Sequence, residues 1–285
     1  MRALVHRGRG SGPASPGTAE RPLPGPGQLL VRVVAAGWPA GQPARPGIVG
    51  EEFAGTVERL GAGAYGWERG DDVLGHCPSG ACAEYVAVDA ERVAGRPAAL
   101  PWAEAALLPL TAASARAALD GLRVRRGETL LVHGAQVPAG RVAVRLALAR
   151  GAAVVAVAPA AARPALREAG AVPVGYGVGL GGRIRAAAPA GVDAVLDAAG
   201  RAAGPLWPAL AGGPGRVAAL GPVPGGRSGA VAESAALAEL VELWEEGAFR
   251  LEPDVVVPLE RAAEVERHAG DGRSVVVTLV ALRRM

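Results

Sequence analysis

Strands and helices alternate over residues 129–174, and this alternation limits the chain to a small set of folds. Thr129–His133 (TLLVH) is a short apolar run typical of a buried strand, and Gly140–Arg150 (GRVAVRLALAR) has the spacing of a helix. Ala153–Val157 (AVVAV) repeats the strand pattern, and Arg163–Ala169 repeats the helix pattern. Short apolar strands that alternate with helices form a parallel sheet with helices on both faces. The segment therefore predicts a doubly wound α/β domain.

Further elements of the same kind follow along the chain. Short strands are predicted at Val172–Val174, Ala194–Asp197, Arg216–Leu220, Asp254–Val257 and Ser274–Val280. Ala235–Glu246 has the periodicity of an amphipathic helix, and Ser234 stands where a capping residue is expected.

The first third of the chain is instead rich in strands and glycine turns. Strands are predicted at Arg2–Val5, Gln28–Ala36, Phe53–Leu60, Asp72–Leu74 and Cys82–Val88. Short strands at this spacing favour a small barrel-like domain. Pro101–Leu119 then has Ala and Leu at helical spacing, which predicts one helix between the two regions.

The composition excludes several kinds of chemistry. All 30 basic residues are Arg, and neither Lys nor Asn occurs in the 285 residues. Without Lys, Schiff-base lysine enzymes and Walker-A nucleotide hydrolases are excluded. Two cysteines, Cys77 and Cys82, are too few for a four-cysteine zinc site. The formal net charge of +3 is spread along the chain, so we expect no nucleic-acid partner.

The apolar segments decide the expected location. No segment has the layout of a signal peptide. Every apolar run of about 20 residues is interrupted by Gly, Pro or charge, which argues against a membrane span. We therefore expect a cytoplasmic protein with reduced thiols and no membrane partner.

Several motifs occur in an order typical of one protein superfamily. They are Gly50–Gly55 (GEEFAG), Tyr65–Gly75 (YGWERGDDVLG), Ala83–Val86 (AEYV), Leu131–Ala135 (LVHGA), Asp193–Gly200 (DAVLDAAG) and the strand 216–221. Over nearly the whole chain this order resembles the medium-chain dehydrogenase/reductase (MDR) superfamily, in its zinc-independent quinone-oxidoreductase and enoyl-reductase branch. The resemblance implies a GroES-like β-barrel domain at residues 1–107, a Rossmann doubly wound parallel-sheet domain at 108–250, and a C-terminal return to the first domain at 251–285.

The same resemblance implies where ligands and partners bind. The active site is expected in the cleft between the two domains, where a small-molecule substrate would bind. A homodimer is expected through the edge of the Rossmann sheet. NADPH is the expected cofactor, and a chain that binds no cofactor stays open as the alternative.

The turn after Thr129–His133 departs from the family pattern. After Gly134, the family's Ala-Ala-Gly-Gly-Val-Gly is replaced by Ala135, Gln136, Val137, Pro138, Ala139 and Gly140. Val137 puts a branched side chain where glycine lets the backbone approach a pyrophosphate. Pro138 has no N–H and so removes one phosphate donor, although it also suits the first position of a helix. These residues are interpreted as a degenerate cofactor turn.

Three further cofactor-binding candidates lie at the ends of later elements. Arg163 can meet a 2′-phosphate, but it equally suits a solvated helix start. Tyr176 falls near the expected adenine or ribose rim, with a core or edge position as the alternative. Gly221 ends the strand that begins at Arg216.

The connection between Ala36 and Gly50 is shorter than in the family. The family's Asn-Pro-x-Asp segment and the loop after it are replaced by Gly37-Trp38-Pro39 and a short link. Since that segment helps to hold nicotinamide and substrate, its loss should widen or reshape the cleft.

Glu51 is the first catalytic candidate. By resemblance it stands where zinc-dependent relatives place a histidine ligand, so its carboxylate can serve as a general acid or base. The alternative is a solvent-exposed or Arg-paired glutamate. Zinc is not expected, because too few ligands are present. Glu52 is expected to orient the turn backbone.

Three other catalytic candidates carry weaker signals. Trp38 can stack on a flat substrate or cap the barrel core. His76 can carry a proton near neutral pH, or it can be a surface-loop histidine. Ser114 aligns with a family hydroxyl near the nicotinamide, and His133 is interpreted as structural.

Three functions compete on these observations. The first is NADPH-dependent reduction of an activated C=C bond, of enoyl or quinone type, in a small or polyketide-like substrate. The second is a cofactor-free cyclase, isomerase or lyase of natural-product biosynthesis, and the third is a binding or scaffold protein. Whole-chain resemblance favours the first, whereas Val137, Pro138 and the shortened loop favour the second.

Overall fold

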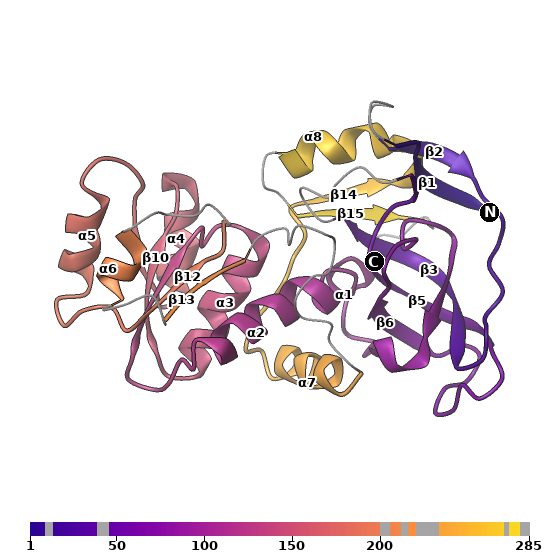
Figure 1. Cartoon of the computed structure of the whole chain (residues 1–285), viewed down its shortest axis with the longest axis horizontal. Coiled ribbons are helices and arrows are strands. Elements are labelled where there is room, and N and C mark those ends of the chain that lie inside the picture. The colour runs from indigo at the N-terminus through magenta and orange to yellow at the C-terminus, as the bar shows by residue number, and fades with distance from the viewer. Residues whose placement is uncertain are drawn as a thin grey trace. The chain divides into compact units, whose positions relative to one another are not determined.

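The computed structural model describes residues 1–8, 14–38, 46–199, 206–211, 216–220, 234–270 and 274–279 (Figure 1). The chain divides into two compact units. Unit 1 comprises Met1–Ala113, Pro224–Glu245 and Leu251–Met285, and unit 2 comprises Ser114–Val223 and Glu246–Arg250. Within the described ranges, every helix is too short or too polar to cross a bilayer.

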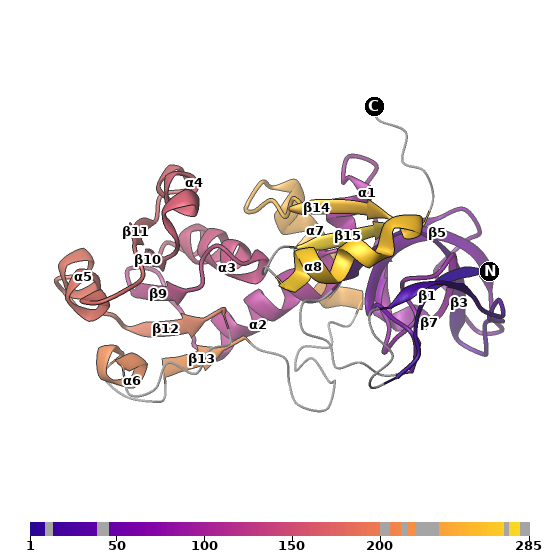
Figure 2. The same ribbon diagram turned by 90° about the horizontal axis from the view of Figure 1, so that it is seen from above.

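Unit 2 contains a five-stranded parallel sheet in its described part, with the order β11-β10-β9-β12-β13 (Figure 2). The strands are β9 (Thr129–His133), β10 (Ala153–Val157), β11 (Val172–Val174), β12 (Ala194–Asp197) and β13 (Val217–Ala219). The helices are α2 (Ala113–Gly121, whose first residue belongs to unit 1), α3 (Pro138–Ala149), η3 (Ala160–Ala162), α4 (Arg163–Glu168), α5 (Leu180–Ala187) and α6 (Leu206–Leu210). Strand order reverses between β9 and β12, as in a doubly wound sheet, so the predicted fold class is confirmed.

Apolar side chains on alternate strand positions form the core of unit 2. Leu131, Val155 and Val195 are buried in one cluster. Ile184 of α5 and Trp207 of α6 pack in the same cluster. Since side chains alternate across a strand, α5 and α6 cover one face of the sheet. Helices α3 and α4 follow β9 and β10 as right-handed crossovers and therefore cover the other face.

Unit 1 contains the strand-rich part of the chain. One sheet has the order β14-β15-β3-β5-β6-β8, with β7 also paired to β3, and a smaller sheet has the order β2-β1-β4. The strands are β1 (Arg2–His6), β2 (Ser15–Thr18), β3 (Gln28–Trp38), β4 (Gly47–Ile48), β5 (Glu52–Leu60), β6 (Asp72–His76), β7 (Tyr85–Asp89), β8 (Val93–Gly95), β14 (Val255–Pro258) and β15 (Val275–Thr278). The remaining short elements are η1 (Ala90–Arg92), η5 (Leu259–Glu264) and α8 (Val265–Gly270). Strand β15 pairs antiparallel with β3, so the chain returns to its first sheet near its C-terminal end (Figure 1).

The predicted single helix at Pro101–Leu119 is wrong. The structure has α1 (Trp102–Ala105), a π-helical segment η2 (Leu108–Ala112) and then α2. Pro109 lies in the π-helical segment and supplies no N–H. The next N–H, that of Leu110, donates to a carboxylate oxygen of Glu52 at 2.9 Å. A proline and a side-chain acceptor together divert the helical hydrogen bonds at this point.

Several predicted boundaries also shift by one to three residues, and two of these shifts concern the motifs described above. Strand β7 begins at Tyr85 and not at Cys82, because the backbone of Cys82 bonds to Leu4 and Val49 instead. Helix α3 begins two residues before the predicted Gly140, at Pro138.

Helix α7 (Ser234–Glu245) belongs to unit 1, although its sequence position places it in the range 108–250. Leu237 and Leu240 on this helix are buried. Trp244 donates its Nε1–H to Glu104 Oε1 at 2.9 Å, and the backbone N–H of Leu251 donates to the same oxygen. Ser234, which was predicted to cap the helix, is its first residue.

Candidate functional site

The turn between β9 and α3 keeps glycine at its first and last positions, Gly134 and Gly140, where the chain packs against itself. Gly134 has a φ of 75°, and a Cβ added there would lie 2.7 Å from the backbone nitrogen of Ala199. A Cβ on Gly140 would collide with the carbonyl oxygen of Gly134. Both positions therefore require glycine, one for conformation and both for close approach. The turn geometry survives the changes between them.

Val137 and Pro138 form the start of α3. Val137 is the N-cap residue, with an extended backbone (φ −73°, ψ 155°) that needs no glycine, and its N–H donates to Gly134 O at 3.0 Å. Pro138 occupies the start of the helix, as the alternative interpretation of this residue proposes. The first-turn N–H groups of α3 are then those of Ala139 and Gly140, and the helix dipole adds to them.

These residues fit a dinucleotide with fewer donors than a glycine-rich turn supplies. The tight packing of the turn at Gly134 and Gly140 is present, and the N-terminus of a 12-residue helix lies directly beyond it. Helix N-termini in this position bind phosphate groups. The missing N–H of Pro138 removes one hydrogen bond and leaves the rest of the arrangement in place.

Gln136 connects the turn to the loop that follows β11. Its side-chain oxygen accepts a hydrogen bond from the Tyr176 hydroxyl at 3.0 Å, and its carbonyl accepts one from Arg141 Nη1 at 3.1 Å. Tyr176, predicted at the nucleotide rim, is 41% exposed. The structure therefore brings Gln136 and Tyr176 together across the carboxyl edge of the sheet.

His133 and Asp197 form a pair at the carboxyl ends of β9 and β12, the neighbouring strands between which the strand order reverses. His133 Nδ1 lies 2.8 Å from Asp197 Oδ1, which also accepts the Ala199 N–H at 3.1 Å. The Asp197 side chain is 2% exposed, and its Oδ2 is buried without a hydrogen-bond partner. The sequence alone predicts a structural role for His133 and does not single out Asp197 as its partner.

Aromatic rings surround the His133 imidazole. Tyr176 contacts it edge-on, with ring centroids 5.4 Å apart, and Trp207 lies 5.0 Å away. Trp207 Nε1 is also buried without a hydrogen-bond partner. An aspartate that holds Nδ1 leaves Nε2 as the group that can accept or donate a proton.

Arg163 lies beside the end of β11. A Cβ on Gly175 would lie 3.5 Å from Arg163 Nη1, and Arg163 Nε is buried without a hydrogen-bond partner. Its predicted contact with a 2′-phosphate stays a prediction. Gly221 lies outside the described residues.

Glu52 is the buried carboxyl group of unit 1. It is 2% exposed and accepts backbone N–H groups of Leu110, at 2.9 Å, and Thr111. Burial raises the pKa of Glu52 from 4.5 to about 8, against the lowering effect of these hydrogen bonds, and nearby Glu51 adds to the rise. Glu52 thus holds backbone of the distant segment Leu108–Ala112, whereas the sequence predicts that it orients the backbone of its own turn.

The catalytic candidates of unit 1 occupy different surroundings. His76 is 3% exposed at the end of β6, opposite Glu52 on β5, so the surface-loop alternative is wrong. Trp38 ends β3 opposite Val275 and packs against the unit 1 core, which supports a core position. Glu51 is half-buried, and its carbonyl accepts the Cys77 N–H at 2.8 Å.

Ser114 and the two cysteines show no feature of a catalytic group. Ser114 is half-buried on α2. Both cysteines are free and buried, and burial raises the pKa of Cys77 to about 12 and that of Cys82 further. Neither thiol is therefore ionised near neutral pH.

Comparison with known proteins gives the family. Residues 25–98 match the model of the alcohol dehydrogenase GroES-like domain. The crystal structure of an NAD-dependent alcohol dehydrogenase superposes with a TM-score of 0.84 and 27% identity, over 98% of this chain and 100% of that chain. The chain therefore has the GroES-like domain of the alcohol dehydrogenases and the whole-chain fold of the medium-chain dehydrogenase/reductase superfamily.

Enoyl reductases and polyketide synthases are among the similar proteins. The pikromycin polyketide synthase component PikAII of Streptomyces venezuelae is 32% identical over 93% of this chain, which corresponds to only 8% of that protein. Crotonyl-CoA reductase of Streptomyces collinus is 30% identical over 37% of this chain and 30% of that protein. The CurK enoyl reductase structure shares the fold with a TM-score of 0.83 at 20% identity, over 97% of this chain and 98% of that chain.

Proposed function

We propose that the chain reduces an activated C=C bond of enoyl type, with NADPH and without zinc, in a small or polyketide-like substrate. One observation carries this proposal: the tight turn at Gly134–Gly140 keeps its close packing and leads into the N-terminus of α3 beside the point where strand order reverses. Similarity to PikAII over 93% of the chain and to crotonyl-CoA reductase supports the substrate class.

In this proposal, residues of unit 2 bind the cofactor and hold a proton. The N–H groups of Ala139 and Gly140 would bind the pyrophosphate. The bound nicotinamide supplies the hydride. His133 Nε2, with Nδ1 held by Asp197 at 2.8 Å, is the group of this edge that can hold a proton.

The test is a titration with NADPH and with NADH, followed by nicotinamide fluorescence. We expect saturable binding that favours NADPH. A variant with Val137→Gly and Pro138→Gly restores the missing N–H, so it should bind about tenfold tighter, as one added hydrogen bond to a charged group allows. A matched variant with Ala187→Gly and Ala188→Gly, at the end of α5, should leave the affinity unchanged. No binding at about 1 mM of either cofactor would overturn the reductase proposal.

A cofactor-free acid–base enzyme is the second candidate. The His133–Asp197 pair favours it, because both partners lie at the carboxyl edge of the sheet and Asp197 is 1% exposed. In this case His133→Gln would abolish turnover of the substrate while the chain binds neither nucleotide. Turnover that requires NADPH would exclude this candidate.

A further inference from the structure

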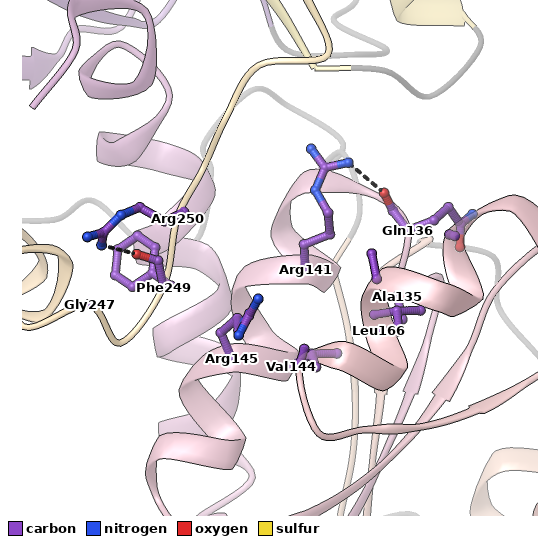
Figure 3. Close-up of a pocket in the computed structure, with 12 residues that line it drawn as sticks. Ala135, Gln136, Arg141, Val144, Arg145, Leu166, Gly247, Phe249 and Arg250 are labelled. Carbon is purple, nitrogen blue, oxygen red and sulfur yellow. Dashed lines mark hydrogen bonds between the residues drawn. The ribbon is translucent and has the colours of Figure 1, made fainter.

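A pocket of about 360 Å³ opens on unit 2 between α3, α4 and the segment 247–250 (Figure 3). It borders the turn at Ala135 and Gln136. His133, Asp197 and Tyr176 are not among its lining residues, all of which belong to the described chain. The pocket is therefore separate from the pair at the carboxyl edge of the sheet.

The walls of the pocket are mainly apolar. Val144 of α3, Leu166 of α4 and Phe249 are 1%, 6% and 1% exposed. The other lining residues on α4 or at its two ends are alanines, at 162, 165 and 169, and their small side chains leave the space open. An apolar pocket of this size suits the body of a small organic molecule.

Three arginines line the same pocket. Arg141 and Arg145 lie one turn apart on α3, a spacing that disfavours two like charges on a helix, and Arg250 comes from the segment after α7. Figure 3 shows Arg141 bonded to the carbonyl of Gln136 and Arg250 bonded to the carbonyl of Phe249, at 3.1 and 2.9 Å. These bonds orient the guanidinium groups.

The lining has no acidic member. Of the twelve described residues that line the pocket, three are arginines and none is Asp or Glu. Three positive charges beside apolar walls are complementary to a molecule with an anionic head and an apolar body.

We propose that this pocket binds an amphipathic organic anion, with its carboxylate or phosphate head on Arg141, Arg145 and Arg250. Its apolar body lies against Val144, Leu166 and Phe249. The proposal is independent of the function proposed above, because neither hydride transfer nor the His133–Asp197 pair enters it.

The experiment uses the whole chain and the fluorescent anion 1-anilinonaphthalene-8-sulfonate. We expect saturable binding of one molecule. Arg145→Gln should weaken it about tenfold, as loss of one charge-assisted contact predicts. Ala165→Leu should abolish binding by filling the pocket without a change of charge. Arg167→Gln, on an exposed α4 residue outside the pocket, is the matched control and should bind as the parent chain does.

Competitors identify the ligand chemistry. Octanoate and octyl phosphate should each displace the probe, and their ratio distinguishes a carboxylate from a phosphate head. Neutral N-phenyl-1-naphthylamine should bind weakly and be insensitive to Arg145→Gln. Equal loss with Arg145→Gln and Arg167→Gln, or displacement by inorganic phosphate alone, would overturn the proposal. Loss of NADPH binding in Ala165→Leu would also overturn it, because the pocket would then belong to the cofactor.

Discussion

Replacement of Glu52 by Gln should remove a large part of the pH dependence of stability. The Glu52 carboxyl is almost completely buried, and its pKa is raised from 4.5 to about 8, chiefly by burial. Between these two values the folded chain keeps a proton that the unfolded chain has released. The contribution of Glu52 to stability is therefore fully present below pH 4.5 and is lost as the pH rises toward 8.

The expected magnitude follows from this window. One proton of difference changes the free energy of unfolding by about 1.4 kcal/mol per pH unit, so the full loss is roughly 5 kcal/mol. Gln cannot ionise, yet its side-chain oxygen can still accept the Leu110 N–H that Glu52 accepts at 2.9 Å. Glu52→Gln should thus be close to the parent chain at pH 5 and clearly more stable at pH 8.

Urea unfolding from pH 5 to pH 8.5, followed by tryptophan fluorescence, measures this difference. Four of the five tryptophans, at positions 38, 67, 102 and 244, belong to unit 1, where Glu52 lies. Glu68→Gln, on an exposed residue of the same unit, makes the same charge change and should keep the slope of the parent chain. If Glu52→Gln and Glu68→Gln give parallel slopes, the argument from burial is refuted.

Three further changes test other contacts. Gly140→Ala should destabilise unit 2 by about 1–3 kcal/mol through overpacking against the turn carbonyl, measured by thermal unfolding, and no loss would contradict the close approach. Glu104→Ala should cost about 2–3 kcal/mol, because Trp244 Nε1 loses its buried acceptor, whereas Glu104→Gln should recover part of it in the same melt. Glu128 pairs with Arg216 at 2.7 Å, and this pair lowers the pKa of Glu128 to about 2. The half-exposed pair should contribute only about 1 kcal/mol at pH 7, lost as the pH falls from 4.5 through 2, and Glu128→Gln should remove that dependence in acid unfolding curves.

The parallel sheet was predictable because its strands are short, apolar on both faces and bounded by glycine or polar residues. β9, β10, β11 and β12 have the predicted bounds. The interruption of the helix at Leu108–Ala112 was not predictable, because it depends on Glu52, which is 58 residues from Leu110 in sequence. The spacing of apolar residues predicts a helix in that segment, but it contains no information about a contact with a carboxylate far away in sequence.

The candidate site was predictable only in its local part. The turn at Gly134–Gly140 has its chemistry in consecutive residues, so its retained glycines and its proline could be interpreted directly. The His133–Asp197 pair joins residues 64 apart and depends on β9 and β12 being neighbours. A sequence signal existed, since both residues end predicted strands, and carboxyl ends of adjacent parallel strands share one edge.

The two buried thiols allow the opening of unit 1 to be measured by chemical modification. Cys77 and Cys82 are its only cysteines, they are 4% and 0% exposed, and both belong to unit 1. An alkylating reagent can reach them only when this unit opens, and the two residues are close enough in sequence to be exposed by one event. The rate of alkylation under native conditions thus measures how often the strands around Cys82 separate, without any label added to the protein.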